Sequence, residues 1–198
     1  MVNGDRQGAQ DSDESLVVRI CNGDHQAFAE LVQRHSGLFF HAAYRMCANN
    51  EEAEDIVQDA FLKLWDKPDV FDPAKGAKFT TWFYRVVINL AIDRTRRRKP
   101  QSHPDVLDYM ADKTPLADEQ YEKKGREASL ESAIQRLPER QRAALNLCFY
   151  EGLSNKDAAE ILGVGVKGLE SLLMRAKKEL KQDLKTRGLI EEEERTGS

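Results

Sequence analysis

The chain has 198 residues, of which 40% are hydrophobic and 32% charged, and its formal net charge is −4. This length suits one domain or two small ones, and no apolar run approaches the ~18 residues needed to cross a membrane. The polar, acidic N-terminus also lacks the pattern of a secretory signal. We therefore expect a cytoplasmic protein whose cysteines, Cys21, Cys47 and Cys148, are buried reduced thiols.

Helical spacing of apolar residues begins at Glu14, after residues 1–13, which are small, polar and acidic and are expected to be disordered. Turn and capping residues set the next helix boundaries. Asn22 and Gly23 end a short helix, Asp24 caps a long one, Asn50 caps a third, Pro68 ends it, and Thr80 or Thr81 begins a fourth. These helices define an N-terminal domain over residues 14–99.

Residues 100–127 have a different character, because they combine prolines and many charges with few apolar residues at helical spacing. We expect them to form a flexible linker. A second helical domain follows over residues 128–187, and residues 188–198 form an acidic tail. Since no alternating strand pattern occurs, the sequence predicts an all-α fold of two small helical domains joined by this linker.

Charge is distributed unevenly along this net-acidic chain. Residues 49–59 contain five acidic residues and no basic one, and residues 78–99 contain seven basic residues and one acidic one. Residues 165–187 contain seven basic residues against three acidic ones. One acidic face and two basic helices indicate different partners for different surfaces.

The acidic segment NEEAEDIVQDAFLKLW, residues 50–65, shows no sign of a catalytic or metal site. It has no histidine at ligand spacing, and acidic residues are favourable in the first turn of any helix. We expect no metal or cofactor here, and instead a protein-binding face that includes Asp55 and Gln58.

Residues 78–99, KFTTWFYRVVINLAIDRTRRRK, interleave aromatic residues with cations, a combination that suits single-stranded nucleic acid. Trp82, Phe83 and Tyr84 cannot all lie on one helix face, so we expect one or two of them to reach a base. A helix C-terminus needs one or two cations to complement its dipole, whereas this segment ends with five. The excess favours contact with phosphates.

The strongest local pattern is SNKDAAEILGVGVKGLESLL, residues 154–173. Ser154 and Asp157 form an S-x-x-D capping box, and Gly163 permits the left-handed turn between two closely crossing helices. This is the pattern of a helix-turn-helix, whose second helix enters the major groove of DNA. That helix would present Lys167, Gly168, Glu170, Ser171, Met174, Arg175 and Lys178 outward. The alternative is an ordinary helical hairpin with a solvated face.

In this order, the three segments resemble bacterial RNA polymerase sigma factors of the extracytoplasmic-function (ECF) class of the sigma-70 family. AEDIVQDAFLKLW is similar to the helix that binds core polymerase, and FTTWFYRVVINLAIDRTRRRK to the helix that recognises and melts the −10 element. LPERQRAALNLCFYEGLSNKDAAEILGVGVKGLESLLMRAKKEL is similar to the domain that recognises the −35 element. The resemblance implies a subunit, not an enzyme, whose partners are core RNA polymerase, promoter DNA and an anti-sigma factor.

The resemblance also assigns candidate residues by position. Those for core polymerase are Asp55, Gln58, Phe61 and Leu62. Those for the −10 element are Phe71, Lys78, Trp82, Asn89, Asp93, Arg94, Arg96, Arg97, Arg98 and Lys99, with a flipped base in the loop 71–78. Those for the −35 element are Lys167, Glu170, Ser171, Met174, Arg175, Lys177 and Lys178. Many relatives have a basic pair where this chain has Glu170 and Leu172, so phosphate contacts are the firmer expectation there.

Three other functions stay open on the sequence alone. A stand-alone helix-turn-helix repressor or activator would need neither the aromatic helix nor the acidic one. A nucleotide-dependent enzyme is suggested by the GxGxxG match at residues 163–168, but no strand pattern precedes those glycines. A regulatory decoy would bind polymerase or an anti-sigma protein without directing transcription.

Overall fold

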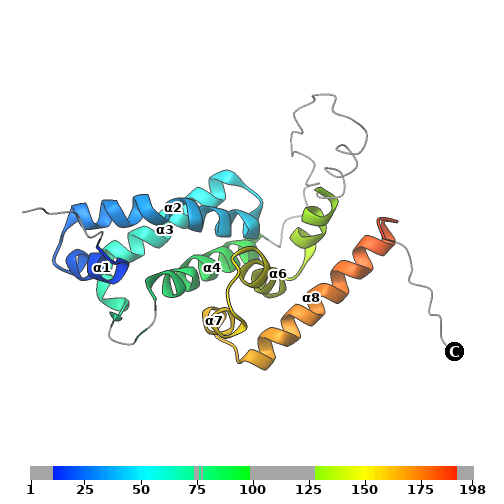
Figure 1. The fold of residues 1–198 in the computed structure, drawn as a ribbon. Helices are drawn as coiled ribbons and strands as arrows, with labels where there is room; N and C mark the ends of the chain where they lie inside the picture. The colour runs from blue at the N-terminus through cyan, green and yellow to red at the C-terminus, as the bar shows by residue number, and fades with distance from the viewer. Residues whose placement is uncertain (1–10, 74–75, 77, 99–127, 191–198) are drawn as a thin grey trace, which may run out of the picture.

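A computed structural model describes residues 11–73, 76, 78–98 and 128–190, and all regular structure in these ranges is helical (Figure 1). The elements are α1 (Asp13–Cys21), α2 (His25–Cys47), α3 (Asn50–Asp66), η1 (Pro68–Val70), α4 (Phe79–Arg98), a helix over residues 128–136, α6 (Glu139–Leu145), η3 (Asn146–Tyr150), α7 (Asn155–Ile161) and α8 (Val166–Thr186). The predicted all-α fold is confirmed. Most of the predicted disordered N-terminus, linker and acidic tail lies outside the described residues.

Most helix boundaries follow the sequence, but the cap of α3 is shifted by one residue and α4 begins at Phe79, before the predicted Thr80 or Thr81. Asp24 caps α2 as predicted, since its Oδ1 accepts hydrogen bonds from the backbone N–H groups of Gln26 and Ala27 at 2.9 and 3.1 Å. The cap of α3 is Asn49 and not Asn50, because its side chain accepts from the N–H of Glu52 at 2.8 Å. The shift arises because Ala48 ends α2 in the left-handed conformation, with φ of 52°.

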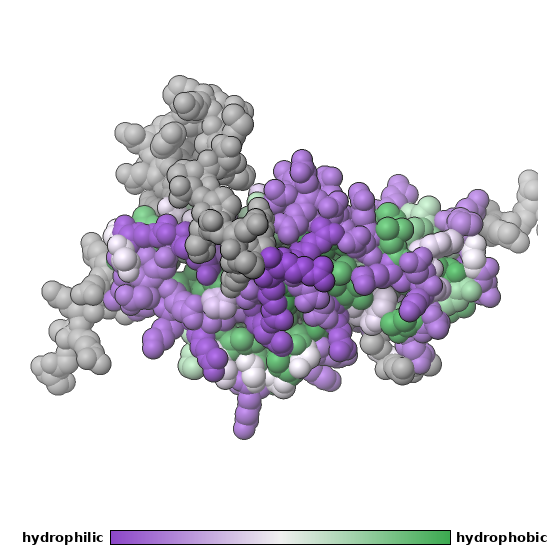
Figure 2. All heavy atoms as spheres, turned by 180° about the vertical axis from the view of Figure 1, so that it is seen from behind, coloured by the Kyte–Doolittle hydropathy of each residue, from purple (hydrophilic) through white to green (hydrophobic). Residues whose placement is uncertain are grey.

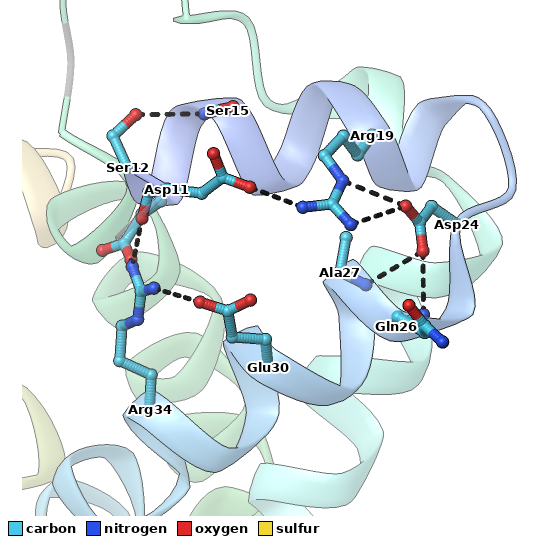
Figure 3. A network of polar contacts seen from close by, with 10 residues as sticks. Asp11, Ser12, Ser15, Arg19, Asp24, Gln26, Ala27, Glu30 and Arg34 are labelled. Atoms are coloured by element: carbon cyan, nitrogen blue, oxygen red, sulfur yellow. Dashed lines mark hydrogen bonds and ion pairs between the residues drawn. The ribbon is translucent and has the colours of Figure 1, made fainter. Parts of the chain in front are cut away.

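Helix α1 is attached to α2 by a network of ion pairs, which Figure 3 shows together with neighbouring caps. The guanidinium of Arg19 contacts Asp11 at 2.5 Å and Asp24 at 2.8 Å, and Arg34 of α2 contacts Asp13 at 2.7 Å. The N–H of Ala27 and then Arg19 lower the pKa of Asp24 from its ordinary value. Most of these groups are partly exposed, so the network orients α1 more than it stabilises the fold.

The core of the N-terminal half is a cluster of phenylalanine rings from three helices. Phe83 of α4 lies at its centre, with ring centroids 4.6 Å from Phe39 of α2, 4.6 Å from Phe61 of α3 and 5.2 Å from Phe79. All four are almost fully buried. Each such ring contributes roughly 1.5–3 kcal/mol through burial, so this cluster fixes how α2, α3 and α4 pack.

The two halves of the chain share one continuous hydrophobic core. Buried residues of the C-terminal half that join the aromatic cluster include Ala143, Ala144, Leu147, Ala158, Ala159, Ile161, Leu162 and Leu169. Helices α6 and α7 both pack against α4, and both also pack against α8 (Figure 1). The sequence predicts two domains but gives no sign that they pack on each other.

The expectation of three buried cysteines is wrong for Cys21 and is met only in part by Cys47 and Cys148. All three are free thiols, but Cys21 is exposed, whereas Cys47 and Cys148 are partly buried. Cys21 is the last residue of α1, one position beyond the buried Ile20, and it lies on the solvent side of the helix. Within the described residues, no helix has the length and apolar content required to span a membrane.

Candidate nucleic-acid and protein interfaces

Helix α3 presents an acidic, partly apolar face to solvent. Of the residues predicted for protein binding, Asp55, Gln58 and Leu62 are exposed, and the exposed fraction of Leu62 is 57%. Phe61 is different, because its ring is buried against Phe83. Phe61 therefore positions this face from below and does not lie on it.

A shallow hollow lies beside this face, between α2 and α3. Its volume is about 340 Å³. The lining residues are Ser36, Gly37, Phe40, Glu54, Val57 and Gln58. Gly37 lies in the middle of α2, and a Cβ added there would meet nothing within 4 Å, so packing within the chain does not require a glycine at this position.

The start of α4 is packed against the loop that precedes it. Phe71 is buried, and its ring centroid lies 5.7 Å from Phe79 and 5.3 Å from Trp82. Lys78 is exposed, and Trp82 is partly exposed. Of the aromatic residues predicted to reach a base, Phe83 and Tyr84 are buried, which leaves Trp82 as the accessible ring.

One stripe of α4 carries the exposed polar residues predicted to contact nucleic acid. Asn89, Asp93 and Arg96 follow at helical spacing and are all exposed, and Arg97 is exposed beside them. Arg85, which is not among the residues predicted from the sequence, is also exposed and precedes Asn89 by one turn. The sequence could have indicated Arg85 as a member of this stripe, because it lies four residues before Asn89. Arg98 ends the helix, and Lys99 lies outside the described residues.

Arg94 does not join this stripe, because it turns toward α3. Its guanidinium contacts Asp59 at 2.5 Å and Asp55 at 3.3 Å. Partial burial acts to lower the pKa of Arg94, but the hydrogen bonds to the two carboxylates outweigh it and raise the pKa. This arginine therefore links α4 to the acidic face of α3 and is held away from the exposed stripe of α4.

Helices α7 and α8 form the predicted helix-turn-helix. The Ser154 hydroxyl caps α7 by accepting from the N–H of Asp157 at 3.1 Å, and Gly163 has φ of +62° in the turn. Gly168 allows a close approach, since a Cβ there would lie 3.3 Å from that of Val164. A helix, not a strand, precedes the glycines of the GxGxxG match, so the context of a dinucleotide site is missing.

The outer side of α8 carries most of the residues predicted for the major groove. The exposed ones are Lys167, Glu170, Met174, Arg175, Lys177 and Lys178. Ser171 is partly buried, and its hydroxyl donates to the Lys167 carbonyl at 2.9 Å. The Nζ of Lys177 lies 5.0 Å from the centroid of the Phe149 ring, and this cation–π contact could not be predicted from the sequence.

The two candidate DNA-binding helices are close together in this structure. Each of α4 and α8 packs on both α6 and α7, so only one layer of helices separates them (Figure 1). Figure 2 shows the molecule from behind, and hydrophilic residues cover most of the surface that is visible in this view. No cluster of histidine, cysteine, aspartate and glutamate suited to a metal occurs among the described residues.

Comparison with known proteins finds two family matches, one in each half of the chain. The family described as Sigma-70 region 2 matches residues 31–101, and the family described as Sigma-70, region 4 matches residues 127–180. The ECF RNA polymerase sigma factor SigM of Mycobacterium tuberculosis is 33% identical over 85% of this chain and 83% of its own length. The RNA polymerase sigma-H factor of Pseudomonas aeruginosa is 31% identical over 88% of this chain and 95% of its own length.

Solved structures agree on the fold. CnrH in complex with the cytosolic domain of CnrY is 27% identical, with a TM-score of 0.63 over 89% of this chain and 99% of that one. RpoE of Bartonella quintana, in complex with the anti-sigma factor NepR, is 24% identical, with a TM-score of 0.60 over 80% of this chain and 96% of that one. The second likeness concerns the fold alone.

Proposed function

Because this chain belongs to the sigma-70 family of RNA polymerase sigma factors, in its extracytoplasmic-function class, we propose that each of its exposed faces binds a different partner during promoter-specific transcription initiation. The observation that carries the proposal is the separation of one acidic face on α3 from two basic faces on α4 and α8. The proposed N-terminal sigma domain is residues 14–99, and the proposed C-terminal one is residues 128–187.

The acidic face of α3 is proposed to bind core RNA polymerase. Asp55, Gln58 and Leu62 combine charge, an amide and an exposed apolar side chain, and the hollow between α2 and α3 adjoins them. Buried Phe61 is proposed to hold this face in shape. An exposed leucine beside polar groups is a common arrangement at protein interfaces.

The stripe on α4 is proposed to contact the −10 element. Arg85, Arg96, Arg97, Arg98 and Lys99 would bind the backbone, while Asn89, Asp93 and Trp82 would engage unpaired bases. Lys78 would add a backbone contact at the start of α4, and Phe71 would support Trp82 from the core, since its own ring is buried. Arg94 would position α4 through its contacts with Asp59 and Asp55.

The exposed side of α8 is proposed to contact the −35 element. Lys167, Arg175 and Lys178 would bind phosphates, and Lys177 would do so from its place over Phe149. Glu170 is exposed and could accept from a cytosine amino group, with Met174 and Ser171 beside it.

The proposal extends to a regulatory protein partner and to the cellular compartment in which the chain acts. The solved relative CnrH forms a complex with the cytosolic domain of a second protein, CnrY, which supports a protein partner for this chain as well, and we propose that this partner is an anti-sigma factor. We propose that the chain acts in the cytoplasm, where promoter DNA and polymerase meet, and that it catalyses no covalent step itself. A stand-alone repressor is less well supported, because it would have no use for the α3 face.

The test is whether promoter binding requires polymerase. Opening a duplex costs a few kcal/mol per unstacked base step, which exceeds what one small domain can supply. We therefore expect tight, specific binding in a gel shift only when bacterial core RNA polymerase is added, with run-off transcription from the same fragments. Equally tight and specific binding by the chain alone would contradict the proposal.

Variants of α3 sharpen this test. The double substitution Asp55→Ala and Gln58→Ala should weaken binding to core polymerase by about tenfold or more, as interface contacts commonly do. Glu160→Ala removes an exposed acid from α7, on the other half of the chain, and serves as the control. Equal affinities of the double variant and this control would refute the assignment of the α3 face.

A further inference from the structure

Helix α8 contains three acidic residues, and two of them are held by side chains of the same half of the chain. Glu179 accepts a hydrogen bond from Gln141 Nε2 at 2.8 Å, and Asp183 contacts the guanidinium of Arg136 at 2.8 Å. The third, Glu170, is exposed and has no hydrogen bond or ion pair within the described part of the chain. Packing of the protein therefore gives no reason for a carboxylate at this position.

The surroundings of Glu170 make a carboxylate unfavourable for DNA binding unless a donor meets it. Exposed cations share this side of α8, namely Lys167, Arg175, Lys177 and Lys178. When these cations bring the helix against a duplex, the phosphates attract them and repel the carboxylate. A hydrogen bond from a base to the charged carboxylate would offset this repulsion, because charge-assisted hydrogen bonds are stronger than neutral ones.

Glu170 lies in the part of α8 that reads bases if α8 is the second helix of a helix-turn-helix. In this motif the N-terminal residues of the second helix contact base edges in the major groove, and Glu170 is the fifth residue of α8. Met174 follows one turn later with an exposed fraction of 65%, so the stripe that holds both residues faces outward. The opposite side of α8 packs inward through Leu169, which is buried, and Leu172, which is partly buried.

The neighbouring Ser171 is limited to accepting hydrogen bonds from DNA. Its hydroxyl donates to the Lys167 carbonyl at 2.9 Å. A hydroxyl has a single hydrogen and two lone pairs, so this bond leaves only acceptor capacity on the oxygen. An ionised glutamate likewise accepts and cannot donate. The two adjacent polar groups, Glu170 and Ser171, therefore both offer acceptors.

Only cytosine and adenine present a hydrogen-bond donor in the major groove. Guanine presents two acceptors, N7 and O6, and thymine presents the acceptor O4 beside its methyl group. An acceptor opposite a carboxylate is repulsive, so guanine and thymine are unfavourable partners for Glu170. Adenine has the acceptor N7 next to its N6 amino group, whereas cytosine offers its N4 amino group without an acceptor of its own on that edge. Cytosine is therefore the base that suits a carboxylate best.

We propose that Glu170 determines sequence specificity in the −35 element: it selects cytosine at one position by accepting a hydrogen bond from the N4 amino group, and it excludes guanine there. Lys167 and Arg175 bind the flanking phosphates, and Ser171 offers a second acceptor to the amino group of a neighbouring base. This assignment rests on the proposed role of α8 and adds to it the identity of one base.

The first experiment measures the base preference directly. The full chain is combined with bacterial core RNA polymerase, and the holoenzyme selects bound fragments from promoters randomised at the −35 element. We expect enrichment of cytosine at one position. Glu170→Gln should change the ratio of cytosine to adenine at that position by about tenfold in favour of adenine, because an amide pairs with adenine N6 and N7. Glu160→Gln makes the same chemical change at an exposed position of α7 and should keep the cytosine. An unchanged preference in Glu170→Gln would overturn the assignment.

The second experiment separates base reading from a structural role. Glu170→Ala removes both the hydrogen bond and the repulsion, so holoenzyme affinity should fall about tenfold for fragments with the selected cytosine. It should rise a few-fold for fragments with guanine at that position. The free energy of unfolding should stay unchanged, since Glu170 is exposed and has no partner in the described part of the chain. A similar decrease in affinity for both fragments would contradict base selection by Glu170.

Failure of the cytosine assignment is distinguishable from failure of the proposed function. If the holoenzyme enriches a defined −35 sequence and transcribes from it, but Glu170→Gln enriches the same sequence, the assignment is wrong and the proposed function stands. If Glu170→Gln exchanges cytosine for adenine but run-off transcription does not start on the selected fragments, the assignment stands and the proposed function is wrong. If the holoenzyme enriches no −35 sequence, both are wrong.

Discussion

At the scale of single residues, capping side chains are the features that the sequence predicts best. Asp24 and Ser154 cap their helices by accepting hydrogen bonds from backbone N–H groups two or three residues ahead, and Gly163 adopts the expected left-handed turn. These features depend on local chemistry alone, so local sequence suffices to predict them. Asn49 and Asn50 are chemically equivalent, and only the unexpected conformation of Ala48 decides which of them is the cap.

Ser154 offers a direct test at this scale. Helix α7 has only seven residues, so loss of its cap removes a large share of its local stabilisation. We expect Ser154→Ala to lower the free energy of unfolding by about 1 kcal/mol, measured by urea denaturation. The control is Ser171→Ala, because that hydroxyl bonds to a carbonyl inside α8 and alanine is a good helix former. An equal decrease in the free energy of unfolding of the two variants would show that the Ser154 cap does not stabilise α7.

The burial of individual candidate residues could not be predicted from their resemblance to a family. Phe61 and Phe71 belong to segments predicted to contact partners, yet both rings lie in the core. The helical spacing of apolar residues favoured burial of Phe61. Phe71 lies in a loop, where no periodic pattern of apolar residues indicates which way a side chain points. A loop residue takes its position from the elements around it, here Phe79 and Trp82.

At the scale of elements, α4 combines two roles on opposite sides. Its apolar side supplies Phe83, Val87 and Ala91 to the core, and its polar side carries the exposed stripe that ends in arginines. The sequence predicts both sides, because the helical period separates them. It did not predict the inward turn of Arg94, since contact with Asp59 depends on how α3 and α4 cross.

The arginines at the end of α4 should act through phosphates. Replacing Arg96, Arg97 and Arg98 by alanine should weaken holoenzyme binding to all promoter sequences. The slope of log K against log salt should flatten by about 2 to 3 units, because up to three phosphate contacts are lost. Arg136→Ala is the control, since this residue pairs with Asp183 at 2.8 Å within the C-terminal half. A slope unchanged from that of the control would argue against phosphate contact.

At the scale of the whole molecule, the packing of the two halves on each other is the main feature that the sequence did not indicate. Asn146, Arg142 and Glu151 look like ordinary polar residues of a helical segment, and nothing local distinguishes them from solvated ones. Their hydrogen-bond partners in α2 lie about a hundred positions earlier, and a single sequence carries no signal for such distant pairs. Local patterns predicted the helices but not this contact.

The shared core predicts how the chain unfolds. Both tryptophans, Trp65 and Trp82, belong to the N-terminal half, so their fluorescence reports on that half alone. Because buried residues of both halves form one cluster, we expect tryptophan fluorescence and far-UV circular dichroism to change in one coincident transition in urea. Two separate transitions would show that the halves fold independently and that the common core adds little cooperativity.

The wide sequence separation across the contact between the halves also has a consequence for how the protein is made. Glu151 follows Arg45 by 106 positions, and Asn146 follows Ala42 by 104. A ribosome that adds roughly 5–20 residues per second releases α2 several seconds before its partners have been synthesised. During that interval water hydrates the end of α2, and the N-terminal half lacks its contacts with the C-terminal half. Each newly made molecule thus passes through an open period before it can close.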